Sequence, residues 1–119
     1  MITFAWLMMG HLVGDWLLQN DWMAQGKKMG LVTFAGWTHF ALYTATIMSA
    51  FWLSGVRGKP LAFYVALSAI VFLSHWLIDS TRLVERWMRF YRQSNLEVVR
   101  LMVDQTLHLL VLAVLAALI

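Results

Sequence analysis

The sequence contains no cysteine and one proline, and only 13% of its 119 residues are charged. The absence of cysteine excludes a disulfide framework and a thiolate metal site. A soluble domain has about twice this share of charged residues. Hydrophobic residues make up 61% of the chain, which is more apolar surface than a soluble core of this length can hide. We therefore predict an integral membrane protein.

We predict an all-α fold, a polytopic four-transmembrane-helix bundle that forms a single transmembrane domain over residues 1–119. Four apolar stretches approach the roughly 20 residues that a helix needs to span a bilayer. We expect these helices over residues 2–19, 31–53, 61–82 and 100–119. The first stretch lacks the basic cluster and the small-residue cleavage site of a signal peptide, so we expect it to be retained as a helix.

The segment 83–99 differs from the four apolar stretches. Apolar side chains fall on one of its helical faces, and arginine, glutamate and glutamine side chains fall on the other. This pattern predicts an interfacial amphipathic segment, or a continuation of the third helix out of the membrane.

The basic residues predict the orientation of the chain. Seven of the nine lie in the connections after the first and third predicted helices. The positive-inside rule then places these connections in the cytoplasm and both termini outside, in a multi-pass protein of the inner (cytoplasmic) membrane. The same rule explains the net charge of +3, so the expected partner is the lipid bilayer and not a nucleic acid. A homo-oligomer is left open.

The four histidines are the main chemical signal in the sequence, because each falls in a different predicted helix. Three of them have an aspartate four residues away, and four residues are about one helical turn, so each pair projects from one face of its helix. The predicted metal ligands are His11, Asp15, His39, His75, Asp79, Asp104 and His108.

The predicted depths of these residues also agree between helices. Counted from the proposed cytoplasmic helix ends at about 1.5 Å per residue, the aspartates form a layer about 6–7 Å deep and the histidines a layer about 12–14 Å deep. In the fourth helix the order along the chain is reversed, as its opposite direction requires. Hydrophobic patterning alone would not produce such layers.

Burial of these aspartates requires compensation, because an ionisable side chain in the bilayer costs about 2.5–3.5 kcal/mol on insertion scales. Two of the four helix segments have no basic residue deep enough to neutralise them. Imidazoles with carboxylates suit zinc best, and also iron or manganese. We therefore predict one or two divalent metal ions, since the candidates exceed the four ligands of one tetrahedral zinc. The alternative is hydrogen bonding across helices, worth about 0.6 kcal/mol per bond.

Five further polar residues have expected roles around this site. Gln19 and Gln105 continue the same helical faces and could orient the ligands. Lys27, Lys28 and Arg82 lie at the proposed mouth and could hold a phosphate, although the positive-inside rule is the preferred explanation for them.

Catalysis would fall to Asp15, Asp79 and Asp104, because an aspartate that does not bind metal could act as a general base toward a water molecule. Because the three basic residues at the mouth could hold a phosphate, a phospholipid or a polyprenyl phosphate is the natural guess for a substrate.

Several motifs also carry a resemblance over nearly the whole chain: His11-Leu-Val-Gly-Asp15-Trp-Leu-Leu-Gln19, Met23-Ala24, Lys27-Lys28, His39, His75-Trp-Leu-Ile-Asp79 and Asp104-Gln105-Thr-Leu-His108. Together they resemble a family of small bacterial and phage membrane proteins of unknown function. That family is distantly similar to the membrane-bound metal-dependent hydrolases, including the LexA-binding inner-membrane type. The resemblance implies a metal-dependent hydrolase and supplies no substrate. The family pattern has a lysine where this chain has Arg82, so the charge is kept but a role specific to lysine would not carry over.

Three other classes of function stay open. Ionisable residues in transmembrane helices also mark paths for protons or metal ions. Histidines on facing helices can bind haem, although the adjacent aspartates would then be unexplained. A phage or bacterial accessory protein could hold a structural metal and act through a partner.

Overall fold

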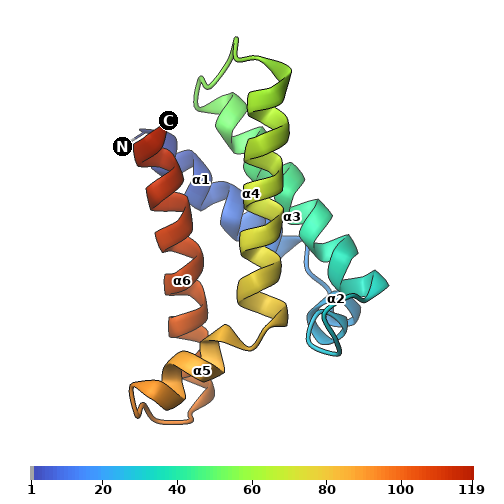
Figure 1. Cartoon of the computed structure of the whole chain (residues 1–119), viewed down its shortest axis with the longest axis vertical. Helices are drawn as coiled ribbons and strands as arrows, with labels where there is room; N and C mark the ends of the chain where they lie inside the picture. Colours follow the sequence, from blue (N-terminus) through green and yellow to red (C-terminus); the bar gives the residue numbers. More distant parts are fainter. Residues whose placement is uncertain (1) are drawn as a thin grey trace.

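The computed structural model describes residues 2–119, and all regular elements of this part of the chain are helices (Figure 1). In chain order they are α1 (Ile2–Leu12), the π-helical turn η1 (Val13–Leu17), α2 (Asp21–Gly26), α3 (Phe34–Leu53), α4 (Leu61–Ser80), α5 (Leu83–Phe90) and α6 (Glu97–Leu118). The all-α prediction is confirmed.

The helix boundaries correct the sequence predictions in two places. The first predicted helix, over residues 2–19, ends as an α-helix at Leu12 and continues as η1. The polar connection that follows contains α2, whose first turn is capped by the Asn20 side chain accepting a hydrogen bond from the Met23 backbone N–H at 2.9 Å. Asparagine is favoured at this position because it satisfies a free donor of the first turn.

Two helices in the described part of the chain are long and apolar enough to cross a membrane, not the predicted four. They are α4 and α6. α1 has 11 residues, too few to span. α3 has 20 residues, but glycine, threonine, serine, histidine and tyrosine lower its hydropathy. The sequence prediction counted apolar residues along the chain and did not weigh these polar side chains, many of which face other helices.

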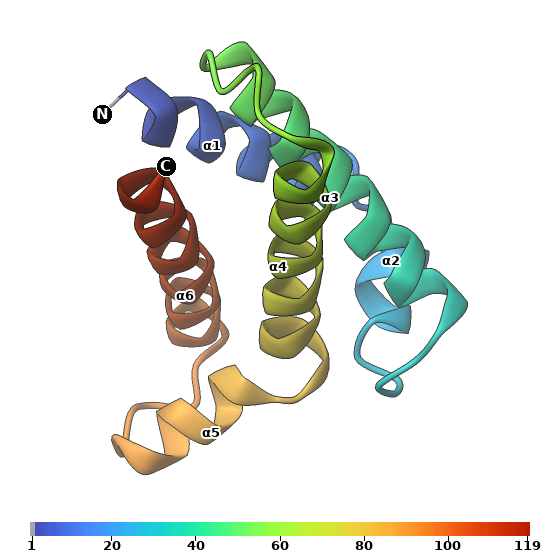
Figure 2. The same cartoon turned by 45° about the horizontal axis from the view of Figure 1, so that its top comes forward.

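α3 lies at the centre of the packing and contacts α1, η1, α2 and α4, while α6 contacts α1 and α4 (Figures 1 and 2). The main apolar core fills the space between these helices. Its members include Leu7, Ile47, Phe51, Val71 and Leu112, each of them at most 1% exposed. This core closes the half of the molecule that lies beyond the histidines, toward the termini.

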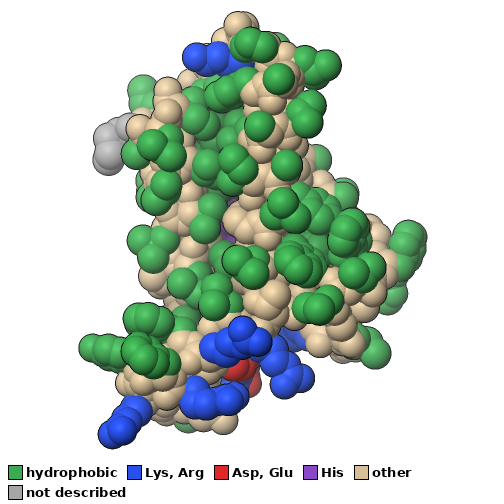
Figure 3. All heavy atoms as spheres, in the orientation of Figure 1, with side chains coloured by type: hydrophobic (Ala, Val, Ile, Leu, Met, Phe, Trp, Pro, Cys, Tyr) green, Lys and Arg blue, Asp and Glu red, His purple; other side chains and the backbone are tan. Residues whose placement is uncertain are grey.

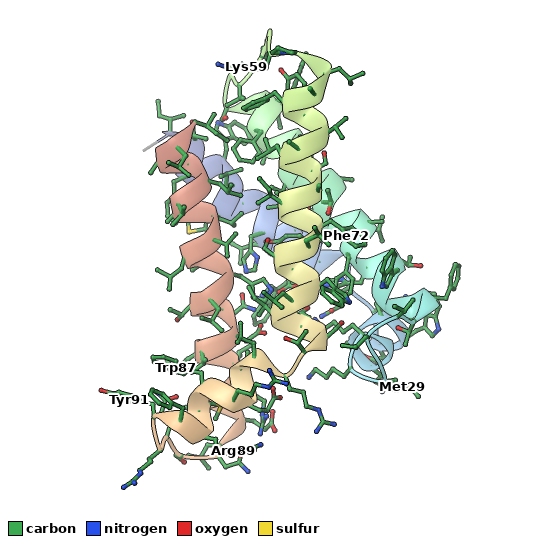
Figure 4. All side chains as sticks on the ribbon, viewed as in Figure 1. Met29, Lys59, Phe72, Trp87, Arg89 and Tyr91 are labelled. Carbon is green, nitrogen blue, oxygen red and sulfur yellow. The ribbon has the colours of Figure 1, made fainter. Side chains whose placement is uncertain are left out.

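The two ends of the molecule differ in the number of charged side chains that they carry. The start of α1 and the end of α6 lie near each other at the end opposite α5 (Figures 1 and 2). Lysine and arginine side chains gather beside α5, and hydrophobic side chains cover the long helices between the ends (Figure 3). Lys59 lies at the end with fewer charged side chains (Figure 4). This distribution agrees with the amphipathic character predicted for the segment after α4, although the helix itself covers only Leu83–Phe90.

α5 lies across the ends of α4 and α6. Val84 and Met88 are buried against these helices. Trp87 and Tyr91 are exposed, and their rings stack with centroids 5.7 Å apart. Figure 4 places both rings at the same end of the molecule as Arg89, opposite Lys59.

Candidate metal centre

The four histidines converge in the interior from four different helices. They come from α1, α3, α4 and α6, and each is at most 2% exposed. Ring centroids lie 4.9 Å apart for His39 and His75, 4.6 Å for His75 and His108, and 5.5 Å for His11 and His108. One imidazole from each long helix therefore contributes to a single buried cluster.

Four ligand atoms face one another within this cluster. They are Asp15 Oδ1, His39 Nε2, His75 Nε2 and Asp79 Oδ2. Five of the six separations between them run from 2.9 to 3.8 Å, and all four atoms lie within 4.8 Å of one another. Tetrahedral ligands at about 2.0–2.1 Å from a zinc ion lie roughly 3.3–3.4 Å apart. The cluster is therefore compact enough that it could hold a metal ion.

The carboxylates and imidazoles do not form two separate layers. Asp15 Oδ1 lies 3.1 Å from His39 Nε2, and Asp79 Oδ2 lies 3.0 Å from His75 Nε2. His75 and Asp79 are four residues apart on α4, so their backbones are about 6 Å apart along the helix axis. Side chains that lean along this axis span the distance. The predicted depths were those of the Cα atoms, whereas the ligand atoms at the ends of the side chains lie together in one cluster.

η1 determines the position of Asp15. Leu18 donates its backbone N–H to Val13 O at 2.9 Å, an i to i+5 hydrogen bond that widens the turn. A Cβ on Gly14 would lie 2.5 Å from Thr46 Oγ1 and 3.1 Å from Tyr43 Cα, so glycine allows η1 to approach α3 closely. This approach brings the Asp15 carboxylate beside His39.

A second group of ligand atoms adjoins the first and shares Asp15 with it. Its other members are Asp104 and His108. The His108 side chain is 2% exposed and the Asp104 side chain is 24% exposed. His108 Nδ1 donates a hydrogen bond to the Asp104 backbone oxygen at 2.7 Å.

His11 belongs to neither group of ligand atoms, although the sequence placed it among the metal ligands. Its Nε2 donates to Gln105 Oε1 at 2.7 Å, and its Nδ1 lies 3.0 Å from the Tyr43 hydroxyl. Both ring nitrogens therefore have partners within the protein. Tyr43 was not singled out from the sequence, yet it follows His39 by one helical turn, and this spacing could have identified it.

Gln105 links His11 to the carboxylates, as expected of a residue that orients ligands. Its Nε2 donates to Asp104 Oδ2 at 3.0 Å and to Asp15 Oδ2 at 3.3 Å. Gln19, for which the sequence suggested the same role, donates to the backbone oxygen of Asp15 at 3.2 Å. Only Gln105 of the two contacts ligand side chains.

Lys27, which the sequence placed at the mouth of the site as a candidate phosphate ligand, contacts the buried carboxylates instead, and the sequence did not predict this contact. Lys27 is 7% exposed. Its Nζ donates to Asp79 Oδ2 at 2.7 Å and lies 4.0 Å from Asp15 Oδ1. Burial disfavours the ammonium form, but the carboxylates of Asp79 and Asp15 outweigh this effect and raise the pKa of Lys27 above its usual value. Depth along the predicted helices could not identify this contact, because Lys27 lies in a connection between helices. α2 folds this connection back against the bundle.

A pocket of about 610 Å³ leads from this cluster to the surface beside α5. Asp15, Asp79 and Asp104 line its inner part. Its basic lining residues are Lys27, Lys28, Arg82, Arg89 and Arg100. All three residues that the sequence suggested for phosphate binding therefore lie along the pocket. Figure 3 shows acidic side chains between lysine and arginine side chains at this end of the molecule.

The basic residues of the pocket are not equivalent. Arg100 lies 2.8 Å from Glu85 and 3.5 Å from Glu97, so its charge is balanced. Within residues 2–119, Lys28, Arg82 and Arg89 form no ion pair with the protein. Arg82 also has a left-handed backbone with φ of 58°, which non-glycine residues adopt rarely. These three charges are available to an anion.

The family model described as "Protein of unknown function (DUF3307)" matches residues 3–119. The chain therefore belongs to this family. No curated protein and no solved structure matches the chain.

Proposed function

We propose that this member of the DUF3307 family is an integral-membrane, metal-dependent hydrolase that acts on an anionic phosphoester, with a lipid as the favoured substrate class. One observation carries the proposal. Four ligand atoms are buried close together, and two of their residues, Asp15 and Asp79, line a pocket that also has several basic lining residues. The resemblance to membrane-bound metal-dependent hydrolases supports the same reaction class.

The donor set fits a borderline divalent ion. Two neutral imidazoles and two carboxylates suit zinc, and manganese or iron would accept the same donors. When bound, such an ion would polarise a phosphoryl oxygen and make a water molecule more acidic. Asp15, His39, His75 and Asp79 would hold it.

The remaining side chains would act on substrate and water. Asp104 is partly exposed in the pocket and outside the four-ligand set, so its carboxylate could take a proton from the attacking water. Lys28 and Arg82 would bind the anionic group and hold it toward the carboxylates. Gln105 would keep the Asp15 and Asp104 carboxylates in place through its amide hydrogens.

The two helices that are long and apolar enough to cross a membrane, α4 and α6, support a membrane location. We propose a multi-pass protein of the inner membrane, with the α5 end at the cytoplasmic face and both termini outside. The exposed Trp87 and Tyr91 beside Arg89 are typical of the level where headgroups meet the hydrocarbon. A pocket that opens beside α5 would then face lipid headgroups.

Proton or metal transport is the second candidate. Lys27 favours the transport of protons, because its ammonium group already neutralises Asp79 and a metal ion is not required to balance that charge. The apolar core around Ile47, Phe51 and Leu112 closes the far half of the molecule, which leaves a transport path without polar groups there. This closure supports hydrolysis over transport.

The test is hydrolysis by purified protein in lipid vesicles, with a soluble aryl phosphodiester and a phosphatidic acid vesicle as probes. We expect phosphate or alcohol release that stops on chelation and returns with Zn²⁺, is lost in Asp79→Asn and is retained in Thr106→Ala. Thr106 is exposed and bonds only within its own helix, so it is a matched control on α6. Turnover that survives complete chelation would contradict the proposal. Zn²⁺ or proton flux without turnover would favour transport.

A further inference from the structure

The carboxylates of Asp15 and Asp79 use only one oxygen each in the four-ligand set. The other oxygen of Asp79, Oδ1, lies 3.3 Å from His108 Nε2. The other oxygen of Asp15, Oδ2, lies 3.3 Å from Gln105 Nε2, which also donates to Asp104 Oδ2. Both free oxygens are therefore close to side chains of α6, Asp79 Oδ1 to His108 and Asp15 Oδ2 to Gln105.

His108 presents a nitrogen to Asp79 Oδ1. Its Nδ1 must carry a hydrogen, because it donates to the Asp104 backbone oxygen at 2.7 Å. In the neutral ring Nε2 then bears a lone pair. This atom is fully enclosed and has no hydrogen-bond partner among the described residues. A lone pair that faces a carboxylate oxygen at 3.3 Å is unfavourable unless a metal ion or a proton lies between them.

We infer that a second divalent ion binds here, held by His108 Nε2, Asp79 Oδ1, Asp15 and Asp104, so that Asp15 and Asp79 bridge two metal ions. The inference rests on the proposed function, since it uses the first site. A separation of 3.3 Å between His108 Nε2 and Asp79 Oδ1 equals the roughly 3.3–3.4 Å edge of a tetrahedral zinc site. Asp15, Asp104 and His108 also supply ligand atoms within 4.8 Å of one another.

The arrangement makes Asp104 a ligand of the second ion, in place of the general base of a one-ion site, and gives Gln105 a defined purpose. The Asp104 side chain is 24% exposed, against 4% for Asp15 and 2% for Asp79, so the second ion would lie nearer to the substrate than the first. Gln105 fixes the free oxygens of Asp15 and Asp104 through one amide group. Two ions about 3.5–4 Å apart would hold an attacking and a leaving oxygen on opposite sides of a phosphorus atom.

The alternative to this second ion is a proton on His108. An imidazolium would satisfy Asp79 Oδ1 without any second metal. A second metal ion and a proton on His108 predict different numbers of metal ions per chain and different magnetic behaviour of the bound ions. Both properties can be measured on the intact protein in detergent.

The experiment is Mn²⁺ titration of purified metal-free protein, read by metal content after desalting and by electron paramagnetic resonance. We expect about two ions per chain and an exchange-coupled signal for wild type, as bridged ions require. Asp104→Asn and His108→Gln should lower the content to about one and give an isolated six-line signal. Thr106→Ala should behave as wild type.

The outcomes separate the two proposals. One ion per chain in wild type, with an isolated signal that Asp104→Asn and His108→Gln leave unchanged, would overturn the second site and keep the first. No bound ion in wild type would overturn both. If either variant fails to fold, the wild-type stoichiometry and coupling still decide the question.

Discussion

Replacement of Gly14 by alanine should weaken metal binding through backbone displacement alone. The new Cβ would lie 2.5 Å from Thr46 Oγ1, 3.0 Å from Tyr43 Cδ2 and 3.1 Å from Tyr43 Cα. Thr46 Oγ1 can rotate away, but Tyr43 Cα belongs to the backbone of α3 and cannot. η1 must therefore move away from α3 by a few tenths of an ångström, and Asp15 moves with it.

The expected magnitude follows from the packing. Overpacking of a tight contact costs about 1–3 kcal/mol. If this strain opposes the metal-bound geometry, the dissociation constant rises roughly 5- to 150-fold, at 1.4 kcal/mol for each factor of ten. Metal–ligand distances tolerate changes of only about 0.2 Å, so we expect the weakening to be at least about fivefold.

The assay is competition for Zn²⁺ against a chromophoric chelator, in detergent, with Gly30→Ala as the matched control. A Cβ on Gly30 would find its nearest atom at 3.7 Å, an ordinary contact. Asp15→Asn provides the reference for loss of the ligand itself. An unchanged zinc affinity in Gly14→Ala, with Asp15→Asn clearly weakened, would refute the idea that this close packing positions Asp15.

Two further predictions concern the charges of the pocket. Lys27→Met should tighten Zn²⁺ binding by roughly tenfold or more, because it removes an ammonium group that competes for Asp79 Oδ2 at 2.7 Å. Weaker Zn²⁺ binding in the same chelator assay would contradict this and show that Lys27 supports the site. Arg82→Gly should relieve about 1 kcal/mol of backbone strain and raise the midpoint of thermal unfolding, yet weaken inhibition by inorganic phosphate severalfold. The control is Arg92→Gly, because Arg92 has φ of 55° and lies outside the pocket lining. It should also raise the midpoint of thermal unfolding but leave inhibition by phosphate unchanged. Equal effects of the two variants on inhibition by phosphate would contradict the role assigned to Arg82.

The sequence predicted the helical class and most members of the His/Asp cluster, because both depend on local spacing. Runs of apolar residues mark the helices, and pairs such as His75 with Asp79 share a helical face whatever their neighbours are. The convergence of one histidine from each long helix follows from equal depth in antiparallel helices, which can be counted along the chain.

Other features depend on tertiary contacts that spacing does not encode. Lys27 reaches Asp79 only because α2 folds back against the bundle, and the two residues are 52 positions apart. The π-helical turn at Asp15 arises where Gly14 meets Thr46 and Tyr43 on another helix. His11 was grouped with the other histidines by depth, but Tyr43 and Gln105 engage both of its nitrogens. The count of membrane-spanning helices was too high because α3 carries polar side chains that serve the interior.

The most direct test of the central claim is the zinc content of purified wild-type protein compared with His75→Ala, measured by elemental analysis after dialysis against zinc-free buffer. His75 Nε2 lies within 3.5 Å of each of the other ligand atoms of the first site, so its removal should empty that site. We expect at least one tightly bound ion per chain in wild type and a clear loss in the variant, with Ser74→Ala, whose hydroxyl bonds only within α4, unchanged. A wild-type protein without any bound transition metal, or a content that His75→Ala leaves unaltered, would contradict the metal centre.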